Sequence, residues 1–319
     1  MSVNSRALGR SSLKVSPLCL GGNVFGWTAD EKTSFALLDA WVDAGFNFID
    51  TADVYSRWAT GHKGGESENV IGRWLAQGGG RRDKVVIATK VGMDMGEGKD
   101  GLAPARIRQA VEESLKRLQT DRIDLYQAHR DDENTPLEAT LEAFGELVKQ
   151  GKVRVLGASN YKAARLAEAL AISKKKGLPR YESLQPLYNL YDRAVFEAEL
   201  QPLCLKEEVG VISFYALAAG FLSGKYRKAE DEGKSARGKN TVGKYLNERG
   251  LKILAALDEA AKRTGETPAR LAIAWVMSRP GMTSPIVSAT SAAQMDEIFK
   301  AARLKLDAPT LALLDQESS

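Results

Sequence analysis

Short apolar runs alternate with amphipathic segments along the whole chain. The runs of strand length lie at 18–21, 46–49, 85–89, 123–128, 153–158, 182–185, 210–214 and 284–287. They are mostly continuous rather than strictly alternating, which is typical of strands buried on both faces of a parallel sheet. Strand and helix repeated about eight times predict an α/β protein, either an open doubly wound sheet or a closed (β/α)8 TIM barrel.

The segments between the runs carry the signals of helices. Pro104 stands at a first helical position, and apolar residues follow on one face at Ile107, Val111, Leu115 and Leu118. Thr267 and Pro268 begin another predicted helix, which ends before Arg279. We expect three tryptophans on helix faces to pack against the sheet: Trp41, Trp74 and Trp275.

The stretch before the first strand bears on the choice between an open sheet and a barrel. The stretch RALGRSSLKVSPL at 6–18 precedes the first parallel strand and is typical of a β-hairpin, which would plug the bottom of a barrel. No linker or shift in composition divides the chain, so we expect one barrel domain over residues 1–319. The polar stretch 225–247 is the longest segment predicted to be irregular, and loops of that length are usually functional or disordered.

Composition narrows the possible functions without changing this picture. The formal net charge is +4 with no nucleic-acid-binding motif, which favours a solvated surface. The apolar run at 271–277 is too short for a membrane span of about 20 residues. Isolated Cys19 and Cys204 form no disulfide framework, and MSVNSRALGR lacks the apolar core of a secretory signal, so we expect a cytoplasmic protein. The two histidines, His62 and His129, complete no metal-ligand spacing, so no metal is expected.

Chemically capable side chains follow three successive predicted strands. Asp50 and Tyr55 come after the run ending at Ile49, Lys90 directly follows the next run, and His129 follows the third. Each has a simpler interpretation alone, such as a helix cap, a surface charge, a packed ring or a structural histidine. Because the carboxyl ends of barrel strands meet at one mouth, the four together predict an active site there.

A glycine fingerprint of dinucleotide-binding proteins also occurs, at Gly96, Gly98 and Gly101. It does not join a strand directly to a helix, and the acidic residues about 20 positions on, Glu112 and Glu113, fall inside a predicted helix. We therefore interpret this stretch as a polar loop rather than a cofactor site.

Six segments in order carry a family resemblance: GFNFIDTADVY, VVIATKVG, DLYQAHR, VLGASNY, LQPLYNLYDR and FLSGKYR. Together they resemble the aldo-keto reductase superfamily, most closely a bacterial branch similar to potassium-channel β subunits and aflatoxin-aldehyde reductases. The resemblance implies a (β/α)8 barrel that reduces an aldehyde or ketone with hydride from NAD(P)H. Tyr55 would be the general acid, with a pKa lowered by Lys90, and Asp50 would hold Lys90 in place. His129 would orient the substrate carbonyl or share in donating the proton.

The resemblance also implies where the cofactor lies. Ser159, Asn160 and Gln185 would bind the carboxamide, and Phe214, or its neighbour Tyr215, would stack on the nicotinamide. The loop over the pyrophosphate would include Leu217, Gly220, Leu222, Gly224 and Lys225. The adenosine end would meet Ala289, Thr290, Ser291, Gln294 and Glu297 at the start of the last barrel helix. Family precedent favours NADP(H), and NAD(H) is also expected to be usable, because no basic residue lies in 288–294. The basic segment 225–239, which contains Lys225, Arg227 and Arg237, could supply a charge from across the groove.

Two positions depart from the family pattern. Family members often have Gly where Ser288 stands and Asn where Ile298 stands, both at the adenosine end. The expected substrate is a small-molecule carbonyl compound in contact with Trp27, Tyr55, Trp58 and His129. Two other functions stay open: an aldolase with a Schiff base on Lys90, and a regulatory subunit that binds the cofactor and turns over slowly.

Overall fold

The computed structural model describes residues 3–96 and 98–319 and contains an eight-stranded parallel sheet. The strands are β3 (Cys19–Gly21), β4 (Phe48–Asp50), β5 (Val86–Val91), β6 (Ile123–Ala128), β7 (Val153–Ser159), β8 (Tyr181–Gln185), β9 (Gly210–Val211) and β10 (Ile286–Val287). Their order in the sheet is β10-β3-β4-β5-β6-β7-β8-β9. Each of the eight predicted runs thus overlaps a strand, and the ends of the strand differ from those of the run by at most a few residues.

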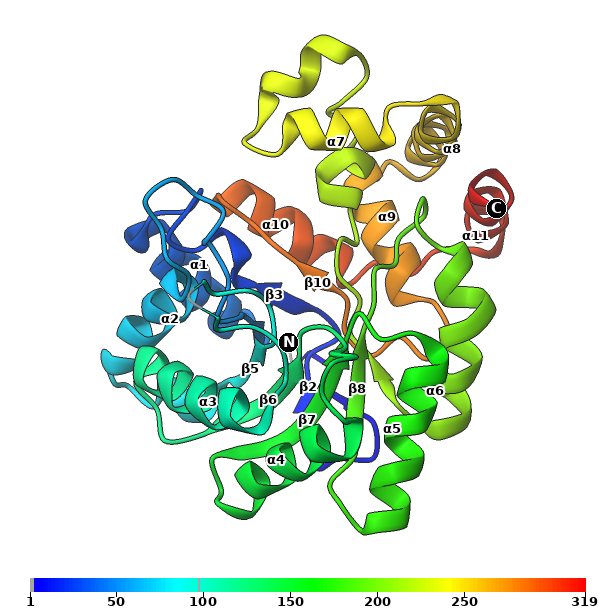
Figure 1. The fold of residues 1–319 in the computed structure, drawn as a ribbon. Coiled ribbons are helices and arrows are strands. Elements are labelled where there is room, and N and C mark those ends of the chain that lie inside the picture. Colours follow the sequence, from blue (N-terminus) through cyan, green and yellow to red (C-terminus); the bar gives the residue numbers. More distant parts are fainter. Residues whose placement is uncertain (1–2, 97) are drawn as a thin grey trace.

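The two outer strands of this order are joined to each other. The Thr283 backbone N–H donates to the Val211 carbonyl (2.8 Å), and the Ile286 N–H donates to the Ser213 carbonyl (2.7 Å). The sheet therefore curls round toward a closed ring, as Figure 1 shows. The predicted (β/α)8 barrel is confirmed, and the doubly wound alternative is wrong.

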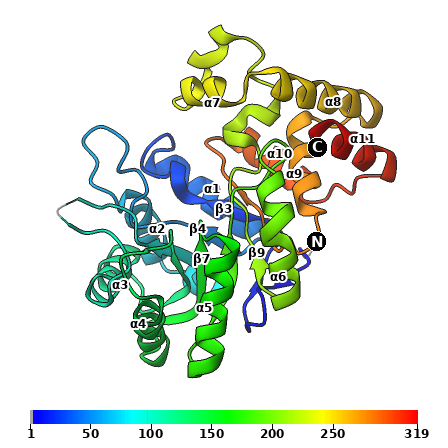
Figure 2. The ribbon, with the colours of Figure 1, turned by 45° about the vertical axis from the view of Figure 1, so that its right-hand side comes forward.

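Helices surround the strands on the outside (Figures 1 and 2). They are α1 (Glu31–Asp43), α2 (Glu66–Ala76), α3 (Pro104–Leu118), α4 (Leu137–Lys149), α5 (Ala163–Lys176), α6 (Gln201–Glu207), α7 (Gly238–Tyr245), α8 (Glu248–Thr264), α9 (Pro268–Met277), α10 (Ala292–Ala301) and α11 (Ala308–Ser318). The helices predicted at Pro104 and Pro268 begin at those residues. Trp41, Trp74 and Trp275 are fully buried, as predicted from their places on helix faces.

The N-terminal hairpin is also confirmed. Strands β1 (Arg6–Ala7) and β2 (Lys14–Val15) pair antiparallel. Leu8, Leu13 and Val15 belong to the apolar cluster inside the barrel, together with Phe48 and Leu125 from its strands. The hairpin thus closes the barrel interior with apolar side chains, and the polar strand ends face the other way.

The prediction that 225–247 is irregular is wrong. This segment contains a short 3-10 turn at Ala229–Lys234 and helix α7, drawn in yellow-green at the top of Figure 1. The segment is rich in glycine and charged residues, so its own sequence does not indicate a helix. The apolar residues that the helix packs against lie in other parts of the chain. Tyr245 at its end is buried and stacks on Phe221.

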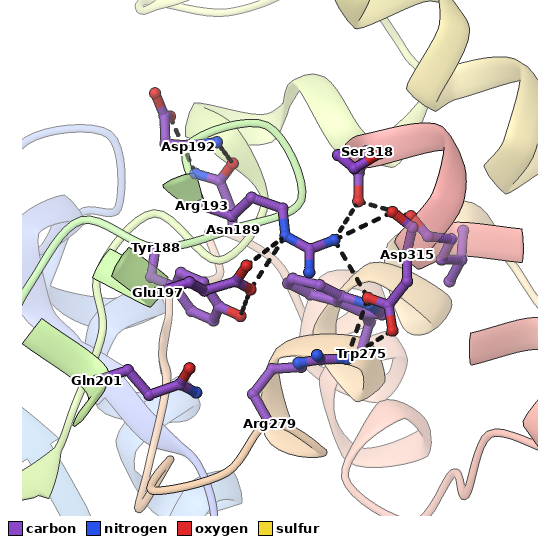
Figure 3. Close-up of polar contacts among 12 residues, drawn as sticks. Tyr188, Asn189, Asp192, Arg193, Glu197, Gln201, Trp275, Arg279, Asp315 and Ser318 are labelled. Atoms are coloured by element: carbon purple, nitrogen blue, oxygen red, sulfur yellow. Dashed lines mark hydrogen bonds and ion pairs between the residues drawn. The ribbon is translucent and has the colours of Figure 1, made fainter. Parts of the chain in front are cut away.

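A buried arginine, Arg193, helps to hold the C-terminal helix α11 to the barrel, as Figure 3 shows. Arg193 donates through Nε to both carboxyl oxygens of Glu197 (3.0 Å each). Its Nη1 donates to Ser318 Oγ (2.7 Å) and to Asp315 Oδ1 (3.1 Å). The guanidinium also lies 4.8 Å from the centre of the Trp275 ring. A buried cation with these partners fixes where the segment before Arg193 lies.

Candidate active site

The four predicted catalytic side chains are brought together at the carboxyl ends of three neighbouring strands. Asp50 is the last residue of β4, Lys90 lies near the end of β5, and His129 directly follows β6. The sheet register pairs Asp50 with Ala88 and Lys90 with Gln127, which sets these strand ends side by side. The mouth expected for a barrel enzyme is therefore where these residues lie.

Lys90 is the centre of a buried polar triangle. Its Nζ donates to Asp50 Oδ2 (2.6 Å), to the Tyr55 hydroxyl (2.8 Å) and to the Thr51 carbonyl (2.8 Å). The Tyr55 hydroxyl in turn donates to Asp50 Oδ2 (3.1 Å). Lys90 and Asp50 are fully buried. All three donors of the ammonium are therefore used, and the amine is not free to attack a carbonyl.

The electrostatics of the triangle differ from the expectation in one respect. Burial and the neighbouring Asp50 carboxylate hold the pKa of Tyr55 well above its usual value. Burial also lowers the pKa of Lys90, against the opposing pull of Asp50. The net direction of the Tyr55 pKa is therefore upward, unlike the lowered value that the resemblance implied, and the stabilisation of the phenolate by Lys90 stays a prediction. A phenol with a raised pKa keeps its proton at neutral pH but is a weaker acid, because the most effective general acids have a pKa near the working pH.

His129 faces the triangle as a neutral ring. It lies edge-on to Tyr55, with the ring centres 6.0 Å apart. Burial, together with the positive charges of Lys90 and Arg130, holds the pKa of His129 well below its usual value. Its Nδ1 is buried and has no hydrogen-bond partner among residues 3–96 and 98–319. A neutral imidazole carries one N–H, which suits it to bind a carbonyl oxygen rather than to protonate it.

The predicted carboxamide ligands lie beside the triangle and are tied to it. Gln185 donates through Nε2 to Asp50 Oδ1 (2.9 Å), and the Ser159 hydroxyl donates to the Gln185 carbonyl (2.9 Å). Asn160 donates to the His129 carbonyl (2.9 Å). Gln127 also donates to Asp50 Oδ1 (3.3 Å). Sequence reasoning missed Gln127 as part of this site, although it stands two residues before His129.

A buried ionic cluster supports β5 from behind the triangle. Glu68 accepts a hydrogen bond from the Thr89 hydroxyl (2.6 Å) and an ion pair from Arg117 (2.6 Å). Beside it, Asp53 pairs with Arg106 (3.2 Å). Burial and the Glu68 carboxylate raise the pKa of Asp53 to about 7. These side chains anchor helices α2 and α3 to the strand that carries Lys90.

The loop predicted to cover the pyrophosphate is a run of left-handed turns. Tyr215, Ala218, Ala219 and Gly220 all have positive φ, at 59°, 47°, 56° and 93°. A Cβ added at Gly220 would lie 3.3 Å from Lys225 Nζ, so the glycine keeps this ammonium close to the turn. Successive peptide N–H groups in such turns form concave sites that favour anions. Phe214 packs at the barrel interior, while Tyr215 is 42% exposed.

The predicted adenosine end lies at the start of helix α10. Ser291 caps the helix by accepting from the Gln294 N–H (3.3 Å), and Gln294 Oε1 accepts from the Thr290 N–H (2.8 Å). Glu297 accepts from the Thr267 hydroxyl (2.7 Å) and pairs with Arg270. Ala289 is buried just before the turn. These residues lie together at the start of α10, and Glu297 is already held by its own partners.

Ser288 and Ile298, the two residues that depart from the family pattern, each contact other parts of the protein. Ser288 Oγ lies 2.7 Å from the side-chain amide of Asn23, and Ile298 is buried in the outer core. Neither introduces a charge at the adenosine end.

The rim of the mouth is aromatic and carries Arg237, one of the cations of the basic segment 225–239. Trp58 lies between Tyr55 (5.9 Å between ring centres) and Trp27 (5.6 Å). The Arg237 guanidinium lies 5.0 Å from the Trp27 ring and contacts the Asn23 amide. Arg227, by contrast, forms a two-fold ion pair with Asp258 of α8. The sequence showed a basic segment but not which of its cations turns toward the mouth.

Two kinds of feature are absent from the described part of the chain. None of its helices is long and apolar enough to cross a membrane. Residues 3–96 and 98–319 also contain no group of three His, Cys, Asp or Glu side chains placed to hold a metal ion.

Comparison with known proteins agrees with this geometry. The chain is 38% identical over 314 residues to a Bacillus subtilis protein named "Uncharacterized oxidoreductase YrpG", covering 97% of this chain and 94% of that protein. It is 35% identical over 300 residues to a rice protein named "Probable voltage-gated potassium channel subunit beta", covering 92% and 89%. It is 32% identical over 323 residues to the L-glyceraldehyde 3-phosphate reductase of Escherichia coli, covering 98% and 91%. The family model for aldo/keto reductases matches residues 17–318, and the chain therefore belongs to the aldo/keto reductase family.

Proposed function

We propose that this protein reduces an aldehyde or ketone to the alcohol, with Tyr55 as the proton donor and NADPH as the preferred cofactor. The observation that carries the proposal is the Tyr55–Lys90–Asp50 triangle, with Lys90 Nζ 2.8 Å from the Tyr55 hydroxyl and 2.6 Å from Asp50. The family to which the chain belongs supports an oxidoreductase that uses NAD(P)H. Buried free Cys19 and Cys204 fit our proposal that it works in the cytoplasm.

The residues at the mouth fit a nicotinamide dinucleotide. Gln185, Ser159 and Asn160 offer amide and hydroxyl groups at consecutive strand ends. The left-handed turn ending at Gly220 and the start of α10 offer two places for phosphate oxygens. When bound there, the nicotinamide supplies the hydride, because no side chain can do so.

The protein's own residues then manage the proton and the carbonyl. Tyr55 holds its proton until negative charge develops on the substrate oxygen, and Lys90 stabilises the phenolate that results. Asp50 keeps Lys90 charged and in place despite its burial. Neutral His129 donates a hydrogen bond that orients the carbonyl, while Trp27 and Trp58 wall the side away from the strands.

We expect His129→Ala to slow reduction of bulky ketones more than reduction of aldehydes, since a larger substrate depends more on the hydrogen bond that orients its carbonyl. We also expect the wild-type kcat/KM to show no titration near pH 6.5, because the lowered pKa keeps His129 neutral above that pH. Steady-state rates for matched aldehydes and ketones from pH 5.5 to 8 test both points. Equal losses for the two substrate classes, or an acid limb that vanishes in the variant, would assign proton donation to His129 instead.

The preference for NADPH over NADH depends on which side chains contact the 2′-phosphate, the group that NADPH carries on its adenosine ribose and NADH lacks. The Thr290 N–H and hydroxyl both already donate to Gln294 Oε1, and residues 288–294 carry no cation. Arg237 reaches Asn23, which lies beside Ser288, so it is a candidate cation for this end of the predicted cofactor site. Charged hydrogen bonds are roughly twice as strong as neutral ones.

We therefore expect a modest NADPH preference, usable NADH, a larger preference in Thr290→Arg, and a reduced one in Arg237→Met. The test compares kcat/KM for the two cofactors in the three proteins. A wild-type preference for NADH would refute the choice of NADPH, and an unchanged ratio in Arg237→Met would remove Arg237 from the phosphate site.

Experiment can distinguish the proposed function from the two others that the sequence left open, an aldolase and a regulatory subunit. A Schiff-base aldolase is disfavoured because all three Lys90 donors are used. A slow cofactor-binding subunit has one specific point in its favour, the similarity to a rice protein named as a potassium-channel subunit beta. Turnover rates across a panel of carbonyl compounds separate it from an enzyme.

A further inference from the structure

A single buried asparagine links two parts of the predicted cofactor groove. Asn189 is fully buried in the loop after β8. Its Oδ1 accepts from the N–H groups of Tyr191 (2.8 Å) and Asp192 (2.9 Å). Its Nδ2 donates to Asp192 Oδ2 (3.2 Å) and to the Tyr215 carbonyl (3.0 Å). Figure 3 shows Asn189 and Asp192 facing each other just before Arg193. Each polar atom of the amide is therefore engaged.

Asp192 extends this link to helix α7. Its Oδ2 also accepts from the Tyr245 hydroxyl (2.8 Å), and its Oδ1 pairs with Lys244 Nζ (3.0 Å). The Tyr245 ring is fixed by packing, since it stacks on Phe221 and meets Tyr191 edge-on. A substitution that removes only the Tyr245 hydroxyl therefore breaks the hydrogen bond to Asp192 and keeps the packing of the Tyr245 ring.

The other end of the link supports strained backbone. Tyr215 has φ 59°, and its carbonyl accepts from the Ala218 N–H (2.7 Å) as well as from Asn189. Ala218 and Ala219 follow, also left-handed. Residues other than glycine rarely adopt this conformation, and it persists only where surrounding contacts impose it. The Asn189 amide is such a contact, at the residue where the turn begins.

We propose that Asn189 and Asp192 are positioning residues for cofactor binding. They form a brace, meaning the chain of hydrogen bonds from Tyr245 through Asp192 and Asn189 to the Tyr215 carbonyl. The brace couples the docking of α7 to the shape of the Tyr215–Gly220 turn, so that loosening one end loosens the other. The inference rests on the proposed function, because the turn matters only if it holds a dinucleotide.

The proposal predicts a change in binding rather than in proton transfer. In Asn189→Asp a carboxylate replaces the amide that donates to Tyr215, at nearly equal volume. In Tyr245→Phe only the hydroxyl at the α7 end is lost. We expect the Kd for NADPH to rise about tenfold in the first and several-fold in the second, as loss of a buried hydrogen bond implies. The kcat at saturating cofactor should change less than the Kd.

The matched control is Tyr188→Phe, which removes another buried hydroxyl of the same loop. Tyr188 donates to Glu197 (2.7 Å), on the side of the loop that holds α11. We expect this variant to lower the melting temperature while leaving the Kd for NADPH within about twofold, because the brace is untouched.

The experiment measures NADPH binding by fluorescence titration and amide hydrogen exchange without cofactor, in the wild type, the three single variants and the double variant Asn189→Asp, Tyr245→Phe. The brace predicts faster exchange at both 215–224 and 238–245 in each brace variant, and a combined effect on Kd below the product of the single effects. Unchanged Kd in Tyr245→Phe, or exchange that rises only next to the mutated residue, would overturn it even if Asn189→Asp failed to fold. Failure of the wild type to bind NADPH would instead refute the proposed function.

Discussion

Replacing Tyr55 by phenylalanine is expected to lower the rate of carbonyl reduction by roughly 10²–10⁴-fold, the usual contribution of a positioned general acid. The substitution removes only the hydroxyl that receives the Lys90 hydrogen bond and donates to Asp50. The ring keeps its contacts with Trp58 and His129, so the fold should be retained. The Kd for NADPH should change little, because Tyr55 acts on the proton. Rates and Kd are measured on the same purified preparation.

A matched control for this variant is Tyr161→Phe. That hydroxyl is buried on the outer side of the barrel, where it meets the Tyr181 hydroxyl (3.3 Å), away from the triangle. We expect its reduction rate to stay close to that of the wild type. Wild-type turnover in Tyr55→Phe would remove Tyr55 from the role of proton donor.

Replacing Lys90 by methionine is expected to abolish activity to a similar extent and also to destabilise the fold. The variant leaves the fully buried Asp50 without its cation. Removing one partner of a buried ion pair typically costs about 3–5 kcal/mol, since the remaining charge is left uncompensated. Thermal unfolding and steady-state rates measure the two effects separately.

A second substitution separates the two effects of Lys90. In the double variant Asp50→Asn, Lys90→Met the buried charge is gone, so we expect part of the lost stability to return while activity stays low. If Lys90→Met alone keeps the wild-type rate and pH optimum, the lysine has no part in the chemistry. Recovery of activity in the double variant would show that the loss came from misfolding.

The repeated strand–helix pattern left a doubly wound sheet and a barrel as alternatives, and the N-terminal hairpin and the family resemblance favoured the barrel. The strand ends were enough to gather the four predicted catalytic residues. The run at 123–128 coincides with β6, because all its residues are buried and no turn residue interrupts it. Only two residues of the run 210–214 form strand β9, with an isolated bridge at Phe214. Hydrophobicity does not show where the ladder of hydrogen bonds between strands stops.

The remaining differences depend on contacts between distant parts of the chain. A basic segment in the sequence does not tell that Arg227 pairs with Asp258 while Arg237 turns toward Trp27. The lysine near Tyr55 suggested a lowered pKa, but burial and Asp50 decide the direction of the shift. Helix α7 was missed because partners outside it, among them Asp192 and Phe221, stabilise it.

The most direct test of the proposed function follows a labelled hydride. The purified protein is incubated with NADPH deuterated at C4 and a panel of aldehydes and ketones, and the alcohols are analysed by mass spectrometry alongside NADPH oxidation. We predict one deuterium on the carbinol carbon for each NADPH consumed, with the signal lost in Tyr55→Phe. Tight NADPH binding without label transfer from any substrate would contradict the proposal and favour a regulatory subunit, while borohydride trapping of a substrate on Lys90 would point to an aldolase.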